Sequence, residues 1–93
     1  MSIEGKIALV TGATRGIGKA ISLELGRQGV VVVGTATSEA GALSITQHLA
    51  DAGIQGKGLL LDVASQESVD AVIGQVQTEF GAIAIVVNNA GIT

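Results

Sequence analysis

The chain reads VTGATRGIG from Val10 to Gly18, a glycine-rich turn that follows an apolar run and opens a helical pattern. Gly12 permits a sharp turn, because a residue without a Cβ adopts dihedral angles that a side chain opposes. Gly16 lets a phosphate approach the backbone, and Gly18 lets the helix pack close to the strand. The N–H groups of the first helical turn and the helix dipole favour an anion there. The turn therefore predicts a site for a pyrophosphate.

Two other interpretations of the turn stand beside this one. The first is a glycine turn with a purely structural role. The second is a P-loop for nucleoside triphosphates, which requires the pattern G-x-x-x-x-G-K-[ST]. Here five residues separate Gly12 from Gly18, and Ala20 follows Lys19 where a P-loop has the hydroxyl that holds magnesium. Both departures argue against a P-loop. The order T-G-x-x-x-G-x-G also differs from the G-x-G-x-x-G of many dinucleotide-binding folds.

Around this turn, short apolar runs alternate with helical patterns along the chain. The runs suit strands buried on both faces of a parallel sheet, and they are Ile7–Val10, Val30–Val33, Leu59–Leu61 and Ile83–Val87. Between them, apolar residues recur at helical spacing, at Ile17, Ala20, Ile21 and Leu25, at Ala42, Ile45, Leu49 and Ala52, and at Val69, Val72, Ile73, Val76 and Phe80. We therefore expect an α/β fold, a Rossmann-type doubly wound parallel sheet with right-handed crossovers and the strand order 3-2-1-4.

Local signals set the expected ends of the elements. We expect Ser65 to cap the third helix, and glycines to stand where helices stop, at Gly29, Gly53 and Gly81. The last strand would be an edge although it is apolar throughout, and an uncovered apolar edge is an aggregation hazard. We therefore expect the sheet to be incomplete, with residues 1–93 forming half of a single domain.

Composition excludes several classes of function. The 93 residues are 47% hydrophobic with one Phe and no Trp or Tyr, which predicts an aliphatic core. A net charge of -3 gives no footprint for nucleic acid, and the absence of Cys with a lone His48 argues against a metal site. Neither a signal peptide nor a membrane-length apolar run is seen, so we expect a cytoplasmic protein without membrane partners. Lys19, Glu24, Arg27 and Gln28 should form a solvated helix face. His48, in the second helix beside Gln47, should be exposed.

Three motifs together resemble one family. Thr11-Gly12-x-x-x-Gly16-Ile17-Gly18, the pair Asp62-Val63 after the third strand, and Asn88-Asn89-Ala90-Gly91 after the fourth are similar to the signatures of short-chain dehydrogenases/reductases. The sequences of the segments Gly5–Gly12 and Gly34–Glu39 look most similar to those of bacterial 3-oxoacyl-[acyl-carrier-protein] reductases. This resemblance implies NADPH-dependent reduction of a 3-oxoacyl group carried by acyl carrier protein, in fatty acid synthesis, by a homotetramer. The alternatives are a family member acting on another alcohol or ketone, and a non-catalytic nucleotide-binding module.

The resemblance also implies which residues bind NADP(H). They are Gly12, Ala13, Thr14, Arg15, Gly16, Ile17, Gly18, Thr37, Asp62, Val63, Asn89, Ala90 and Gly91. Asp62, helped by the backbone of Val63, would contact the adenine, the alternative being an Asp that caps the next helix. The segment 89–91 would line the adenosine ribose, and its Asn and Gly also suit a polar turn.

The choice of NADP over NAD follows from charge. A site for the NAD ribose usually has an acid about 20 residues past the glycine turn, and here no acid follows the second strand until Glu39. Arg15 could reach the 2′-phosphate through a charge-assisted bond, with hydroxyls from Thr37 and Ser38; a solvated Arg15 is the alternative.

Residues 1–93 provide no catalytic residue. In the family that the motifs resemble, catalysis uses a Tyr, a Lys, a Ser and an Asn that follow the Asn-Asn-Ala-Gly motif, and this chain contains no Tyr. Carbonyl reduction needs a proton donor near the hydride acceptor. We therefore expect residues 1–93 to supply cofactor binding, as part of an NADP-binding domain, and to be inactive alone.

Overall fold

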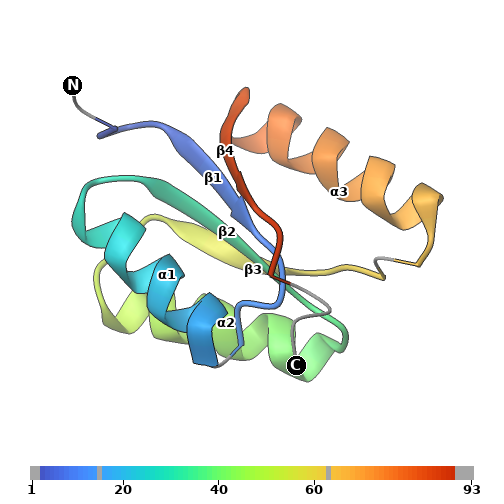
Figure 1. The fold of residues 1–93 in the computed structure, drawn as a ribbon, viewed down its shortest axis with the longest axis horizontal. Helices are drawn as coiled ribbons and strands as arrows, with labels where there is room; N and C mark the ends of the chain where they lie inside the picture. Colours follow the sequence, from blue (N-terminus) through green and yellow to red (C-terminus); the bar gives the residue numbers. More distant parts are fainter. Residues whose placement is uncertain (1–2, 15, 63, 90–93) are drawn as a thin grey trace.

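A computed structural model of the chain describes residues 3–14, 16–62 and 64–89. Strands and helices alternate in the order β1 (Ile7–Val10), α1 (Gly16–Arg27), β2 (Val31–Ala36), α2 (Glu39–Asp51), β3 (Gly56–Leu60), α3 (Gln66–Glu79) and β4 (Ile83–Val87). The strands form one parallel sheet with the order β3-β2-β1-β4. Figure 1 shows α1 and α2 on one face of this sheet and α3 on the other. The predicted open α/β topology is confirmed.

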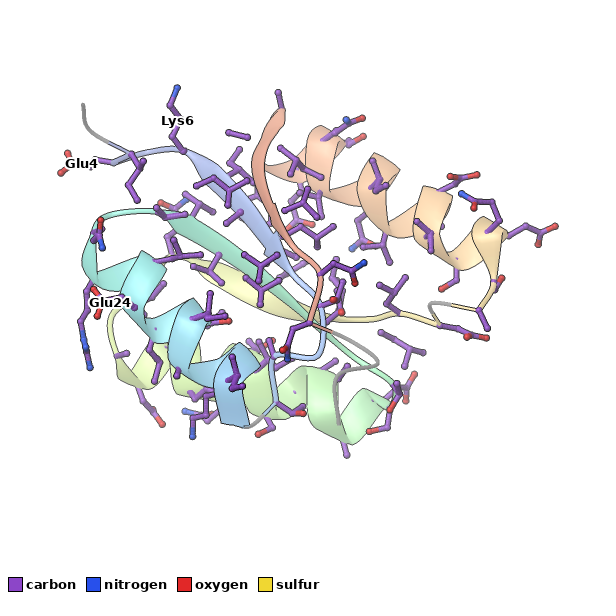
Figure 2. The ribbon with its side chains drawn as sticks, in the orientation of Figure 1. Glu4, Lys6 and Glu24 are labelled. Atoms are coloured by element: carbon purple, nitrogen blue, oxygen red, sulfur yellow. The ribbon has the colours of Figure 1, made fainter. Side chains whose placement is uncertain are left out.

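The core has two layers, because successive residues of a strand point to opposite faces of the sheet. Ala8 and Val10 of β1 belong to the cluster that includes Ile45 and Leu49 of α2. On the other face the cluster with α3 comprises Ile7, Leu9, Val33, Leu61, Val72 and Val76. Figure 2 shows side chains filling the space on both faces of the sheet, while the labelled charged residues Glu4 and Lys6 lie on the surface. The predicted aliphatic core is therefore present in both layers.

The boundaries of the second and third strands differ from the predicted ones. β2 does not stop before Gly34 but continues to Ala36, since it is paired on both sides, with β1 and with β3. β3 begins at Gly56 rather than at Leu59, so its first half is Gly-Lys-Gly and carries little apolar signal. Close packing explains Gly58, because a Cβ there would collide with the carbonyl oxygen of Ala42 on α2.

The predicted helix ends are confirmed, whereas one residue predicted for the buried face of α1 is exposed. Ser65 caps α3, accepting a hydrogen bond from the Ser68 N–H at 3.2 Å. The glycines after the three helices all have positive φ: 84° at Gly29, 72° at Gly53 and 124° at Gly81. Ile17, however, does not belong to the buried face of α1: it is 64% exposed, and α1 buries the small residues Gly18 and Ser22 instead.

The sheet has an apolar free edge at β4, as predicted. Val86 is 64% exposed, and beside it a hollow of about 410 Å³ lies between β4 and α3. Its lining is mostly apolar and includes Leu9, Val72, Ile73 and Ile83. The opposite edge, β3, is partly covered, because the Gly58 N–H donates to Thr46 Oγ1 of α2 at 2.9 Å. In the part of the chain described, no helix has the length and apolarity needed to cross a membrane.

Candidate functional site

The glycine turn connects the end of β1 to the start of α1. Gly12 and Gly16 have φ angles of 65° and 63°, in the left-handed region that favours glycine. Between them Ala13 is fully buried, and its N–H donates to the Thr35 carbonyl of β2 at 3.0 Å. A Cβ built on Gly16 would meet nothing within 4 Å, so the space beside this backbone is open to a ligand. The turn is thus fixed on its inner side and open on its outer side.

Hydrogen bonds tie this turn to the end of β4. The Asn89 N–H donates to Thr11 Oγ1 at 2.9 Å, and the Asn89 Nδ2 group donates to the Gly12 carbonyl at 3.1 Å. The Thr11 hydroxyl has one hydrogen, which faces the Asn88 Oδ1 at 3.2 Å and the Val87 carbonyl at 3.4 Å. Thr11 N–H also donates to the Val87 carbonyl, at 3.0 Å. Residues almost eighty positions apart therefore hold the turn in one shape.

Gly18 brings the first turn of α1 against this network. A Cβ at Gly18 would collide with the carbonyl oxygen of Gly12 and lie 2.7 Å from Nδ2 of Asn89. The Gly18 carbonyl in turn accepts a hydrogen bond from the buried Ser22 hydroxyl at 2.8 Å. The close packing expected of Gly18 is confirmed. It places the N-terminus of α1, with its free N–H groups and positive dipole end, beside the open backbone of the turn.

A second hollow lies at the carboxyl ends of β2 and β3. It has a volume of about 350 Å³ and is lined by Thr37, Leu60, Leu61, Asp62 and Ser68. Asp62 is exposed, and its Oδ1 accepts from the Ala64 N–H at 3.0 Å. Among the described residues, Oδ2 has no hydrogen-bond partner. Since Ser65 caps α3, the interpretation of Asp62 as a helix cap is wrong, and its second carboxylate oxygen is available to a ligand.

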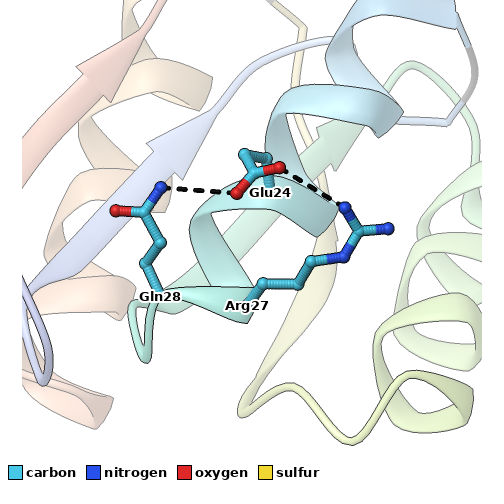
Figure 3. A network of polar contacts seen from close by, with 3 residues as sticks. All are labelled: Glu24, Arg27 and Gln28. Carbon is cyan, nitrogen blue, oxygen red and sulfur yellow. Dashed lines mark hydrogen bonds and ion pairs between the residues drawn. The ribbon is translucent and has the colours of Figure 1, made fainter.

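Negative charge is sparse around the glycine turn. Between Thr11 and Thr37 the one acidic residue is Glu24, whose carboxylate accepts from Arg27 and Gln28, each at 3.3 Å, on the outer surface of α1 (Figure 3). This solvated face was predicted. Glu39 lines a different hollow, between α2 and β3. Ser38 caps α2 by accepting from the Gly41 N–H at 3.1 Å, which leaves its hydroxyl hydrogen able to donate.

The structure brings most of the predicted site residues together at the carboxyl ends of the strands. Gly12, Ala13, Thr14, Gly16 and Gly18 form the turn, Asn89 braces it, and Thr37 and Asp62 line the neighbouring hollow. The exposed Ile17 lies on the first turn of α1. The predicted contacts of Arg15, Val63, Ala90 and Gly91 fall outside the described residues.

Two side chains near the carboxyl ends of the strands, Thr11 and Ser68, were not among the predicted binding residues. The Thr before the first glycine was a usable signal, because a hydroxyl there can reach the end of the next strand in the sheet. The spacing Asp62-x-x-Ser65-x-x-Ser68 was another, since residues three apart share one side of a helix start.

The lone histidine departs from its prediction. His48 is half-buried, and its Nδ1 and Nε2 are shielded from solvent without a hydrogen-bond partner among the described residues. This burial lowers the pKa of His48 below its usual value, the charge of Lys19 on α1 lowers it further, and Asp51 opposes the shift. Within the described ranges no three His, Cys, Asp or Glu residues are grouped as a metal site would require.

The sequence of the chain matches those of known proteins. A family model described as short chain dehydrogenase matches residues 6–93. The whole chain is 60% identical to the 3-oxoacyl-[acyl-carrier-protein] reductase FabG of Pseudomonas aeruginosa, covering 38% of that protein, and 54% identical to the FabG of Escherichia coli, covering 37%. With the FabG of Haemophilus influenzae the identity is 55% over 91 residues, 98% of this chain and 36% of the relative. The chain thus spans less than two-fifths of the length of these relatives.

Proposed function

Because the chain belongs to the short-chain dehydrogenase family, we propose that residues 1–93 form the dinucleotide-binding part of an NADPH-dependent 3-oxoacyl-[acyl-carrier-protein] reductase. The observation that carries the proposal is the glycine turn, held open beside the N-terminus of α1 by Thr11 and Asn89. The activity of the matched relatives supports the choice of substrate. The family shares a nicotinamide cofactor, and the described residues fit one, as follows.

We assign the diphosphate, the adenine and the adenosine ribose to separate features at the carboxyl ends of the strands. The diphosphate would rest on backbone N–H groups between Gly12 and Gly18, where the absence of side chains leaves room and the helix dipole attracts negative charge. The adenine would enter the hollow lined by Thr37, Leu61 and Asp62, with Asp62 accepting a hydrogen bond from the 6-amino group. Asn89 would border the ribose. When bound, the cofactor supplies the hydride for carbonyl reduction, and these residues position it.

The preference for NADPH over NADH rests on charge. A carboxylate beside the ribose 2′ position would repel a phosphate, and the nearest acid along the chain, Glu39, lines another hollow. Thr37 and Ser38 could donate hydroxyl hydrogens to the 2′-phosphate, and we assign its charge partner to Arg15. A charge-assisted bond of this kind contributes about 1.5–3 kcal/mol, roughly a ten- to hundredfold preference.

The remainder of the reaction is assigned to other parts of the protein. Residues 1–93 contain no Tyr, so the proton donor and the groups that polarise the carbonyl would come from outside this range. We extend the proposal to an acyl carrier protein-bound substrate and a homotetramer in fatty acid synthesis.

The test is binding and turnover by the full-length protein. Calorimetry should show NADPH binding at least about tenfold more tightly than NADH, and acetoacetyl thioester should be reduced faster than simple sugars, steroids or alcohols are oxidised. Arg15→Ala should weaken NADPH binding far more than NADH binding, whereas Arg27→Ala, on the surface face of α1, should change neither. Absence of any dinucleotide binding would refute the proposed function, and equal losses in Arg15→Ala would refute the role of Arg15.

A further inference from the structure

We infer that Ser68 is a positioning residue for adenine recognition, acting by fixing Asp62 at the mouth of the hollow that both residues line. The inference rests on the proposed function, in which Asp62 accepts a hydrogen bond from the adenine amino group. It starts from a closed set of hydrogen bonds at the start of α3. The Asp62 N–H donates to Ser68 Oγ at 3.0 Å, the Ser68 N–H to Ser65 Oγ at 3.2 Å, and the Ser65 N–H to the Asp62 carbonyl at 3.0 Å.

This arrangement differs from an ordinary helix cap. In a capping box, the side chain three residues into the helix bonds the N–H of the capping residue itself. Here the capping residue Ser65 gives its N–H to Asp62, and the Ser68 hydroxyl reaches past Ser65 to the backbone N–H of Asp62. Ser65 alone serves the helix, by accepting from Ser68 N–H. The acceptor role of the Ser68 side chain therefore serves Asp62 and not the helix.

The result is an acid held on nearly every side. The backbone N–H of Asp62 is bound by Ser68, its carbonyl by Ser65, and its Oδ1 by the N–H of Ala64. Among the described residues, Oδ2 alone of its polar atoms makes no hydrogen bond. An exposed side chain normally loses rotamer freedom when it binds a ligand, and an acid already fixed avoids much of that loss. Ser68 thus prepares one carboxylate oxygen for a donor in the hollow.

The experiment compares two dinucleotides in the full-length protein. The probes are NADPH and its purine analogue, in which hydrogen replaces the 6-amino group of adenine. Wild type should bind NADPH about tenfold more tightly, because the analogue lacks the hydrogen bond to a carboxylate. Ser68→Ala should reduce this preference about three- to tenfold and raise KM for NADPH at unchanged kcat, because the acid is present but its backbone N–H is no longer held.

Matched variants separate positioning from structure. Ser68→Thr keeps a hydroxyl and should keep the preference, whereas its isostere Ser68→Val should lose it; this pair also tests the inference if the alanine variant fails to fold. Ser44→Ala, on the exposed surface of α2, should resemble wild type. Asp62→Ala should abolish the preference altogether.

Each outcome has one meaning. If Asp62→Ala abolishes the preference while Ser68→Ala and Ser68→Val keep the wild-type ratio, the positioning role is refuted and the proposed function stands. If wild type binds both dinucleotides equally, the adenine role of Asp62 is wrong, and the role of Ser68 with it. If wild type binds neither, the proposed function itself fails.

Discussion

Replacing Thr11 by Val tests whether the end of β4 holds the glycine turn in its binding shape. Thr11 is 7% exposed. Valine keeps the branched shape of its side chain and replaces the hydroxyl with a methyl group. That hydroxyl accepts from the partly buried Asn89 N–H at 2.9 Å and donates toward Asn88. A buried donor left without an acceptor costs about 1–3 kcal/mol. The exposed Asn88 amide can bond to water instead, so the loss of its hydrogen bond with Thr11 adds little to this cost.

We therefore expect Thr11→Val to lower the free energy of unfolding of the full-length protein by about 1–3 kcal/mol. Urea unfolding, followed by circular dichroism with and without NADPH, measures it. The variant should also bind NADPH more weakly, because the turn must be reordered on binding. Thr78→Val, an exposed position on α3, is the matched control and should change stability by less than about 0.5 kcal/mol. A Thr11→Val protein as stable as this control, with wild-type affinity for NADPH, would show that the link to β4 does not shape the turn.

Three further changes probe the edge strand β3, the half-buried His48 and the close packing of α1 at Gly18. Thr46→Val leaves the Gly58 N–H without its acceptor and so uncovers the β3 edge, and light scattering on heating should rise earlier than in Thr78→Val; equal onset would contradict this. The pKa of His48 is lowered in the folded state, so the stability due to its neutral ring is complete above about pH 6.5 and declines as the pH falls through the lowered pKa. Urea unfolding should show wild type losing more stability than His48→Leu toward pH 5, and a pH-independent difference would refute the assignment. Gly18→Ala should cost about 1–3 kcal/mol and most dinucleotide binding, by calorimetry, whereas Gly74→Ala, with open space at its Cβ, should not; matching behaviour of the two would refute the packing argument.

The elements that could be predicted are those whose pattern has one physical solution. Val69, Val72, Ile73 and Val76 lie on one face of α3 and pack in the same cluster as Phe80, which follows the helix, because no other spacing buries them together. The strand order followed from chain alternation and the handedness of crossovers. The backbone of the glycine turn was predictable to the same degree, since Gly12 and Gly16 adopt the left-handed conformation and Gly18 packs closely.

The remainder depended on neighbours that a local pattern does not show. Gly56 and Gly58 lie in β3 because α2 and β2 press on their backbones, a tertiary cause that overrides a low strand propensity. Ile17 occupies a helical apolar position yet is exposed, since the helix start is held close by Gly18 rather than by a large side chain. His48 was predicted to be exposed, but its ring nitrogens are shielded and the charge of Lys19 on α1 acts on it, neither of which a local pattern shows.

The site is assembled by long-range contacts, although its motif is local. Thr11 and Gly12 are joined to Asn89 across 77 or 78 positions, so the turn is complete only when β4 has paired with β1. The chain reaches β4 from β3 through the crossover helix α3. The first turn of α3 also fixes Asp62, through Ser68. The acid and the glycine turn therefore depend on the same crossover, one at its beginning and one at its end. A ligand that contacts both would stabilise the crossover as a unit, so under the proposed function dinucleotide binding should also stabilise the β1–β4 pair.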